Sequence, residues 1–218
     1  MVTAKYDHIW DCCCDHGLLG AALFARQAAP HIHFVDIVPA LMLELETKLN
    51  RFYPKTAEPN SQWRVHCIDV ATLPLAEFNG KNLVIIAGIG GDLMTELVTQ
   101  IYQKNPELDI DFLLCPVYHQ FTLRQQLIQF DFRLKTETLI IENQRFYEIL
   151  LVSTTKSSST RNSTISPVGN LIWQSNTPEQ AKIAADYLKK TLDHCKRVQL
   201  SRQAEVQHII DAYNAVTI

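Results

Sequence analysis

The chain has 218 residues, which is room for one full α/β domain and an appendage but excludes two large domains. Hydrophobic residues make up 47% and charged residues 20%, which is typical of a globular protein with a sizeable core and excludes widespread disorder. The net charge of −3 gives the whole chain no basic character of the kind that advertises nucleic-acid binding.

No apolar run approaches the roughly 20 residues that a membrane span requires, and the first residues lack the apolar core of a signal peptide. We therefore expect a cytoplasmic protein that makes no membrane contact. Three of the six cysteines are adjacent, at Cys12, Cys13 and Cys14, and no pair has the C-x-x-C spacing. The pattern indicates reduced thiols and predicts neither a disulfide framework nor a metal site.

Short apolar runs rich in β-branched and aromatic residues alternate with helical stretches along the first 130 residues. This alternation is typical of βαβ units, in which helices cover both faces of a parallel sheet. The predicted strands are His8–Cys12, Ile32–Asp36, Trp63–Cys67, Asn82–Ala87 and Asp111–Cys115. The predicted helices cover about Leu18–Ala28, Ala40–Phe52, Asp92–Gln103 and Phe121–Phe130.

Two long β-type runs follow the fifth strand, separated by a polar turn around Asn143–Gln144, and they predict an antiparallel hairpin. Five βα units closed by such a hairpin distinguish the S-adenosylmethionine (SAM) methyltransferase sheet from a dinucleotide-binding Rossmann domain. The expected fold is therefore the α/β class I SAM-dependent methyltransferase fold, which is Rossmann-like. Its mostly parallel seven-stranded sheet ends in an antiparallel strand, and a C-terminal α-helical tail follows.

The segment from residue 153 to 167 consists mainly of Ser and Thr, so we expect a flexible linker there. The expected units are a catalytic domain over 1–152, the linker over 153–169 and a helical region over 170–218. Thr177 and Pro178 open a helix that reaches about Arg197, and a second helical stretch, about Ser201–Ala215, pairs with it or continues it. Residues 153–218 hold 8 Lys and Arg against 5 Asp and Glu, whereas residues 1–152 hold 12 against 18, so the tail is the basic part.

The turn after the first strand reads Asp11-Cys-Cys-Cys-Asp15-His-Gly17. Ligands of open α/β sheets bind outside the carboxyl ends of the strands, so this turn borders the expected ligand site. Gly17 permits close approach of the backbone, and Asp11 or Asp15 is suited to the ammonium group of SAM. The G-x-G-x-x-G fingerprint is absent, and carboxylates would repel a pyrophosphate. The alternative is structural: Asp15 caps the helix and the cysteines are small core residues.

Acidic residues also end the next two strands. Asp36 is placed to accept both ribose hydroxyls of an adenosine cofactor, and Asp69 to accept a hydrogen bond from the adenine amino group. Each of these residues is also a common turn former, so either carboxylate alone is a weak signal. The recurrence of acids after three successive strands is what favours a SAM site.

The turn after the fourth strand, Ile86-Ala-Gly88-Ile-Gly-Gly-Asp92, lies where methyltransferases place the loop between methyl donor and substrate. Its glycines permit close approach to a planar base, although they and Asp92 also suit a tight turn with a helix cap. After the fifth strand, Tyr118 is suited to stack on a base and His119 to contact substrate or RNA. An exposed loop histidine is often incidental. In the tail, Lys189, Lys190, Lys196 and Arg197 are candidate phosphate contacts or a solvated helix face.

These motifs resemble the bacterial TrmK family of tRNA (adenine(22)-N1)-methyltransferases, over about residues 8 to 152. The matching residues are Asp11, Asp15 and His16; Ile86–Gly91; Leu114–Pro116; and Glu142-Asn143 with Tyr147–Leu150. The resemblance implies methyl transfer from SAM to N1 of an adenine in the D-arm of tRNA. Because N1 already presents a lone pair, positioning dominates catalysis, and Asp15 or Asp92 would stabilise the cationic product.

The residues expected at each part of this site follow from the motifs and the resemblance together. Cofactor contacts are expected from Asp11, Cys13, Asp15, His16, Gly17, Asp36, Ile37, Asp69, Val70, Ala87 and Gly88. Substrate contacts are expected from Gly90, Gly91, Pro116, Tyr118, His119, Lys189, Lys190, Lys196 and Arg197. We expect a monomer or weak dimer with tRNA as its partner.

The chain departs from the family pattern at three positions. Cys13 replaces a glycine and narrows the cofactor turn, Asp36 stands where Glu is frequent, and Val117 replaces an Asn that offers a polar contact to the base. The family also carries a helix before its first strand, and we expect that segment, which helps to hold RNA, to be missing here. The alternatives are a non-catalytic SAM- or RNA-binding protein, a small-molecule methyltransferase, and a nucleotide-dependent oxidoreductase, which the missing glycine fingerprint disfavours.

Overall fold

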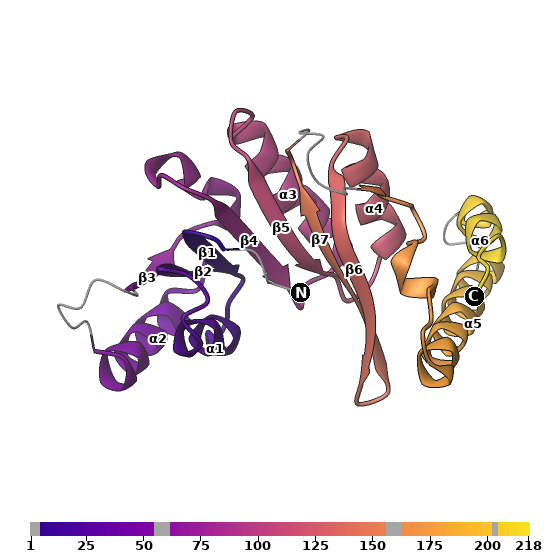
Figure 1. Ribbon diagram of the computed structural model, residues 1–218, viewed down its shortest axis with the longest axis horizontal. Coiled ribbons are helices and arrows are strands. Elements are labelled where there is room, and N and C mark those ends of the chain that lie inside the picture. The colour runs from indigo at the N-terminus through magenta and orange to yellow at the C-terminus, as the bar shows by residue number, and fades with distance from the viewer. Residues whose placement is uncertain (1–4, 55–61, 156–162, 202–204) are drawn as a thin grey trace.

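The structure is a computed structural model that describes residues 5–54, 62–155, 163–201 and 205–218. One twisted sheet runs through the molecule, with the strand order β3-β2-β1-β4-β5-β7-β6-β8 (Figure 1). The strands are β1 His8–Cys12, β2 His31–Asp36, β3 Gln62–Cys67, β4 Asn82–Ala87, β5 Ile110–Cys115, β6 Arg133–Glu142, β7 Arg145–Ser153 and β8 Ser163–Thr164. The first five are parallel, and β7 pairs antiparallel with both β5 and β6. The predicted α/β architecture is confirmed, with β8 as a short addition at the edge.

The helices connect the strands as the periodicity predicts. They are α1 Leu18–Ala25, α2 Pro39–Phe52, α3 Gly91–Lys104, α4 Gln120–Gln129, α5 Pro178–Leu200 and α6 Gln207–Asn214, with 3₁₀ turns η1 Val70–Thr72, η2 Leu75–Glu77 and η3 Leu171–Trp173. Helix α1 ends earlier than predicted because Gln27 adopts the left-handed conformation, with φ of 52°. The Ala28 N–H then donates to the Leu23 carbonyl at 3.0 Å, which closes the helix.

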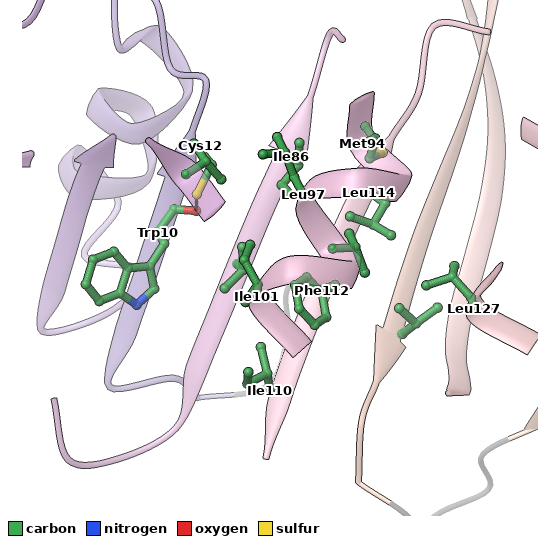
Figure 2. Packing of buried hydrophobic residues seen from close by; sticks show 14 of the residues in the cluster. Trp10, Cys12, Ile86, Met94, Leu97, Ile101, Ile110, Phe112, Leu114 and Leu127 are labelled. Carbon is green, nitrogen blue, oxygen red and sulfur yellow. Dashed lines mark hydrogen bonds between the residues drawn. The ribbon is translucent and has the colours of Figure 1, made fainter. Parts of the chain in front are cut away.

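Helices cover the sheet on both faces. Alternate residues of a strand point to opposite faces, so Ile9 of β1 packs with α1 and α2, whereas Trp10 faces the layer of α3 and α4. Figure 2 shows this second layer, where Ile86, Met94 and Phe112 pack between the sheet and α3. Strand β1 is buried along its whole length, as a central parallel strand should be.

The C-terminal helices lie beyond β6 at one end of the sheet (Figure 1). They are attached through a buried ionic cluster in which Arg124 of α4 contacts Glu137 at 2.7 Å and Glu148 at 2.7 Å. The Tyr187 hydroxyl of α5 donates to Glu148, and the backbone N–H groups of residues 170 and 171 donate to Glu137. Because every charge of this cluster is paired, the tail is fixed to β6, β7 and α4.

The Ser- and Thr-rich segment is described only at its two ends, since residues 156–162 lie outside the described ranges. Its C-terminal end pairs with β6 as β8, and Ile165 is buried in the core. Helix α5 begins with the predicted cap, in which the Thr177 hydroxyl accepts the Gln180 N–H at 3.2 Å. Helix α6 packs beside α5 rather than extending it. None of the helices in the described ranges has the length and apolar character needed to cross a bilayer.

Candidate functional site at the carboxyl ends of the strands

The candidate site lies at one edge of the sheet. Strands β1 to β5 are parallel, so their carboxyl ends, from Cys12 to Cys115, meet at this edge. The strand order reverses between β1 and β4, because β2 lies on one side of β1 and β4 on the other. Open α/β sheets bind ligands at such a reversal, which separates the turns after β1, β2 and β3 from those after β4 and β5. We call these two groups the first side and the second side.

The turn after β1 is built from left-handed residues. Cys13, Asp15 and Gly17 have φ values of 54°, 49° and 68°. A Cβ on Gly17 would lie 2.7 Å from Leu45 Cδ1, so both the conformation and the packing require glycine there. Cys13, the departure from the family glycine, adopts a conformation that is strained for a side-chain-bearing residue. The structure therefore gives a physical reason why a glycine suits position 13.

Asp11 is buried behind this turn, with 4% of its surface exposed. Its carboxylate accepts the Gly20 N–H at 2.8 Å, which joins β1 to α1. Burial raises the pKa of Asp11 to about 7, against the opposing effect of the Gly20 hydrogen bond. Asp11 is thus a group that organises the turn, and Asp15 is the acid of this motif that is exposed to solvent.

Asp36 connects the turns after β1 and β2. Its Oδ2 accepts the Asp15 N–H at 3.1 Å, and its Oδ1 accepts the Val38 N–H at 3.1 Å. Each carboxylate oxygen has a further lone pair, so both remain able to accept a hydroxyl donor. Asp36 is only partly buried, and Ile37 beside it is largely exposed.

Asp69 caps η1, because its Oδ1 accepts the Ala71 N–H at 2.9 Å, and Val70 is buried beneath it. Three of the acids of the first side, Asp11, Asp36 and Asp69, act on Cys13. Burial raises the pKa of the Cys13 thiol to about 11, and the negative charges of Asp36, Asp11 and Asp69 add to this rise. The parallel pairing of β1, β2 and β3 brings the turns that carry these acids to the same edge of the sheet, and the bond from the Asp15 N–H to Asp36 joins two of these turns.

The second side is formed by two turns joined through their backbones. The Gly88 N–H donates to the Cys115 carbonyl at 3.1 Å, and the Val117 N–H donates to the Ile89 carbonyl at 3.0 Å. Gly88 is left-handed, with φ of 78°, and a Cβ built on it would meet no atom within 4 Å. The turn after β4, next to Ala87 and opposite Pro116, is therefore open where a ligand would approach.

Gly90 and Gly91 make room for the neighbouring turn. A Cβ on Gly90 would lie 2.4 Å from the Tyr118 hydroxyl oxygen, and a Cβ on Gly91 would lie 2.5 Å from the Tyr118 carbonyl oxygen. The Tyr118 ring therefore lies on Gly90, with 54% of the residue exposed. In the structure these two glycines serve the packing of the loops, which was the structural alternative for this motif.

Asp92 and His119 form a hydrogen-bonded pair across the two turns of the second side. His119 Nδ1 lies 2.7 Å from Asp92 Oδ2, and 50% of the His119 side chain and 66% of the Asp92 side chain are exposed. The sequence places these residues 27 positions apart and carries no signal of their contact. The pairing depends on the left-handed backbone of His119, with φ of 59°, which only the structure reveals.

The four basic residues selected in the tail share one face of α5. They line an open groove of about 640 Å³, and its other described lining residues are Asp186, Asp193 and Leu200. Lys190 Nζ also lies 5.2 Å from the centre of the Phe146 ring, so this face continues onto the β6–β7 hairpin. We call Lys189, Lys190, Lys196 and Arg197 the basic face of α5. No group of three or more metal-binding side chains is found within the described ranges.

Asp15 and His16 are both exposed, and His16 Nε2 lies 3.7 Å from Asp15 Oδ1. The turn after β1 thus presents one acid and one imidazole to solvent, at the edge of the sheet where Asp11, Asp36 and Asp69 also lie. The expected site residues of the domain gather on the two sides of the strand reversal. Helix α5, which carries the basic face, lies beyond β6 at the end of the sheet (Figure 1).

Comparisons with known proteins give a family and a fold. The family model for a methyltransferase domain matches residues 1–150. No curated protein matches the chain in sequence. Among solved structures, M. capricolum TrmK in complex with S-adenosyl-homocysteine is 16% identical, with a TM-score of 0.69 over 96% of this chain and 90% of that one.

Two further solved structures are similar over nearly the whole chain. Streptococcus pneumoniae Sp1610 in complex with S-adenosyl-L-methionine is 20% identical, with a TM-score of 0.68 over 98% of this chain and 93% of that one. The B. subtilis m1A22 tRNA methyltransferase TrmK is 18% identical, with a TM-score of 0.65 over 95% of this chain and 86% of that one. The shared fold therefore includes the C-terminal helices as well as the sheet.

Proposed function

The chain belongs to the methyltransferase domain family, and from this premise we propose that it transfers a methyl group from SAM to N1 of an adenine in tRNA. The observation that carries the proposal is the recurrence of acids at the carboxyl ends of three neighbouring parallel strands, with Asp11, Asp36 and Asp69, beside the open turn at Gly88. The bound S-adenosyl compounds of two similar structures support the same cofactor. The adenine of tRNA position 22 is the expected target, as the B. subtilis relative's name suggests.

The first side fits an adenosyl group in charge and in hydrogen-bonding chemistry. Asp36 accepts the two ribose hydroxyls with its remaining lone pairs, and Asp69 accepts from the adenine amino group. The exposed Asp15 pairs with the ammonium group, while Asp11 supports the turn. The remaining cofactor contacts are Cys13, His16, Gly17, Ile37 and Val70 on the first side, with Ala87 and Gly88 from the turn after β4 on the second side.

SAM, when bound, supplies an electrophilic methyl group on a sulfonium ion. The role of the chain is to align the N1 lone pair of adenine with that methyl group, because no proton has to leave N1 before attack. The methylated base is cationic, so the carboxylate of Asp15, and that of Asp92 through its contact with His119, stabilise the developing charge from the two sides of the strand reversal. The base must first leave its stack in folded tRNA, and Tyr118 offers an exposed ring for it.

The tail supplies the contacts to the RNA backbone. The basic face of α5 presents four cations beside the hairpin, which suits several phosphates of a folded RNA. Gly90, Gly91 and Pro116 complete the substrate side of the domain. A protein with this substrate acts in the cytoplasm.

The test is methyl incorporation from tritiated SAM into an unmodified tRNA transcript, compared with the same transcript carrying guanine at position 22. We expect incorporation into the first transcript only, and 1-methyladenosine in its nucleoside digest. SAM binding is measured by calorimetry on the same preparation. SAM binding without incorporation above a heat-treated control would reject the proposed activity and support a non-catalytic role.

A further inference from the structure

We propose that His119, oriented by Asp92, accepts a hydrogen bond from the exocyclic amino group of the target adenine and so selects adenine over guanine. The assignment rests on the proposed function and makes it more specific. It gives His119 direct contact with the substrate and makes Asp92 a positioning residue.

The Asp92 contact sets the tautomer of His119. An ionised carboxylate only accepts hydrogen bonds, so the 2.7 Å contact between Asp92 Oδ2 and His119 Nδ1 requires the proton on Nδ1. In the neutral imidazole the other nitrogen, Nε2, then carries a lone pair. Within the described ranges Nε2 has no hydrogen-bond partner, and half of the side chain is exposed. His119 therefore presents a fixed acceptor at the second side.

The imidazole is held in place by its surroundings. The backbone carbonyl of His119 accepts the Leu123 N–H at 3.2 Å in the first turn of α4. The Tyr118 ring meets the imidazole edge-on, with 4.8 Å between the ring centres. The turn itself is tied to the turn after β4 through the bond from Gly91 N–H to the Tyr118 carbonyl, at 2.9 Å. The turn that carries His119 is thus fixed against the turn after β4, which is open at Gly88.

Adenine and guanine differ at the position next to N1. Adenine carries an amino donor there, whereas guanine carries a carbonyl acceptor, which Nε2 would repel. A bond from the amino group to Nε2 also fixes the orientation of N1, because N1 is the ring atom next to the carbon that carries the amino group. During transfer the N1 lone pair forms the bond to the methyl carbon, and the electrons of the carbon–sulfur bond return to sulfur. The positive charge that passes to the base spreads onto the amino group and strengthens its bond to Nε2.

The test is a cycle of two enzymes and two RNAs. The wild type and His119→Phe are each assayed on a tRNA with adenine at the target position and on the same tRNA with purine, which lacks the amino group. With adenine, we expect His119→Phe to lower kcat/KM by about tenfold to a hundredfold, the effect of losing a charge-assisted hydrogen bond. With purine, we expect the substitution to have little effect. His119→Gln, which keeps an acceptor, should recover part of the adenine rate.

The variant Asp92→Asn is a second test. Its amide can donate to Nδ1 and so place the proton on Nε2, which removes the acceptor, and we therefore expect a loss of rate similar to that of His119→Phe. Equal loss on both RNAs in His119→Phe would overturn the assignment and leave the methyltransferase activity standing. Failure of the wild type to methylate the adenine RNA would overturn both. Calorimetric SAM binding by each variant shows whether the first side is still formed.

Discussion

The two sides of the site are held together in different ways. On the first side, the carboxylates of Asp11, Asp36 and Asp69 accept backbone N–H groups, so the acids that face a ligand also fix the turns. On the second side, the turns are joined backbone to backbone, and Asp92 and His119 are left free to pair with each other at the surface. Substitutions on the first side should therefore affect folding and cofactor binding together, whereas those of the exposed Asp92 and His119 pair should affect turnover alone.

The largest expected effect concerns the buried acid of the first side. Since the pKa of Asp11 is raised from 3.8 to about 7, the folded chain retains a proton that the unfolded chain loses between these pH values. Stability contributed by this group is therefore present at low pH and lost as pH rises through about 7, by an amount on the order of 4 kcal/mol. Asp11→Asn should remove this dependence. The difference between the urea unfolding free energies of the variant and the wild type, measured from pH 4 to 8, tests it.

Burial lowers the pKa values of His8, His31, His33 and His66, which lie on β1, β2 and β3, and that of His33 falls to about 2. Their effect has the opposite sign, because the unfolded chain binds protons below about pH 6.5 that the folded chain does not. Both proteins of the Asp11 comparison contain these histidines, so the difference curve isolates Asp11. A flat difference curve would show that Asp11 is ionised when the chain is folded.

A matched pair of glycine substitutions compares the rigidity of the two sides. Gly17→Ala adds a left-handed alanine and a Cβ 2.7 Å from Leu45, so we expect a loss of about 3 kcal/mol. Gly88→Ala adds the same backbone strain in open space and should cost about 1 kcal/mol. The unfolding free energies of both variants give the comparison. Equal losses would contradict the difference in packing between the two turns.

Asp36→Asn tests the ligand role of the first side with little change of shape. The amide retains one acceptor and replaces the other by a donor, so we expect SAM affinity to fall about tenfold to a hundredfold. Asp92→Asn is the control on the second side, where SAM affinity should be unchanged. Calorimetric titration of both variants measures the effect, and an equal fall in affinity would remove the proposed division of roles.

The smallest effect is expected in the tail. Lys196→Ala removes one cation of the basic face of α5, which should lower tRNA affinity modestly. The slope of the logarithm of the binding constant against the logarithm of the salt concentration should fall in magnitude by about one. Lys182→Ala is the control, because Lys182 pairs with Asp186 at 3.1 Å and lies outside the basic face. Filter binding at several salt concentrations measures the slope. The same slope for both variants would argue against phosphate contacts along this face.

The fold could be predicted because buried parallel strands appear as short apolar runs and their ends as acids and glycines. The hairpin after β5 was evident from two long β-type runs around Asn143, and the helical caps from Thr177 and Pro178. These are local signals, and the structure confirms the elements that they predict.

The contacts between distant residues could not be predicted. Nothing in the sequence shows that Arg124 is a buried residue paired with Glu137 and Glu148, because a charged residue on an amphipathic helix is ordinarily solvated. Likewise, burial of Asp11 and the pairing of Asp92 with His119 depend on the turn conformations. The convergence of the acids was predicted from their recurrence after successive strands, whereas their second role as acceptors of backbone N–H groups was not.

A crystal structure of the protein soaked with S-adenosyl-homocysteine tests the central claim most directly. We predict that both ribose hydroxyls lie within hydrogen-bonding distance of the Asp36 carboxylate, that the adenine amino group faces Asp69, and that the sulfur faces Gly88. A ligand bound away from these carboxylates, or no binding at saturating concentration, would contradict it.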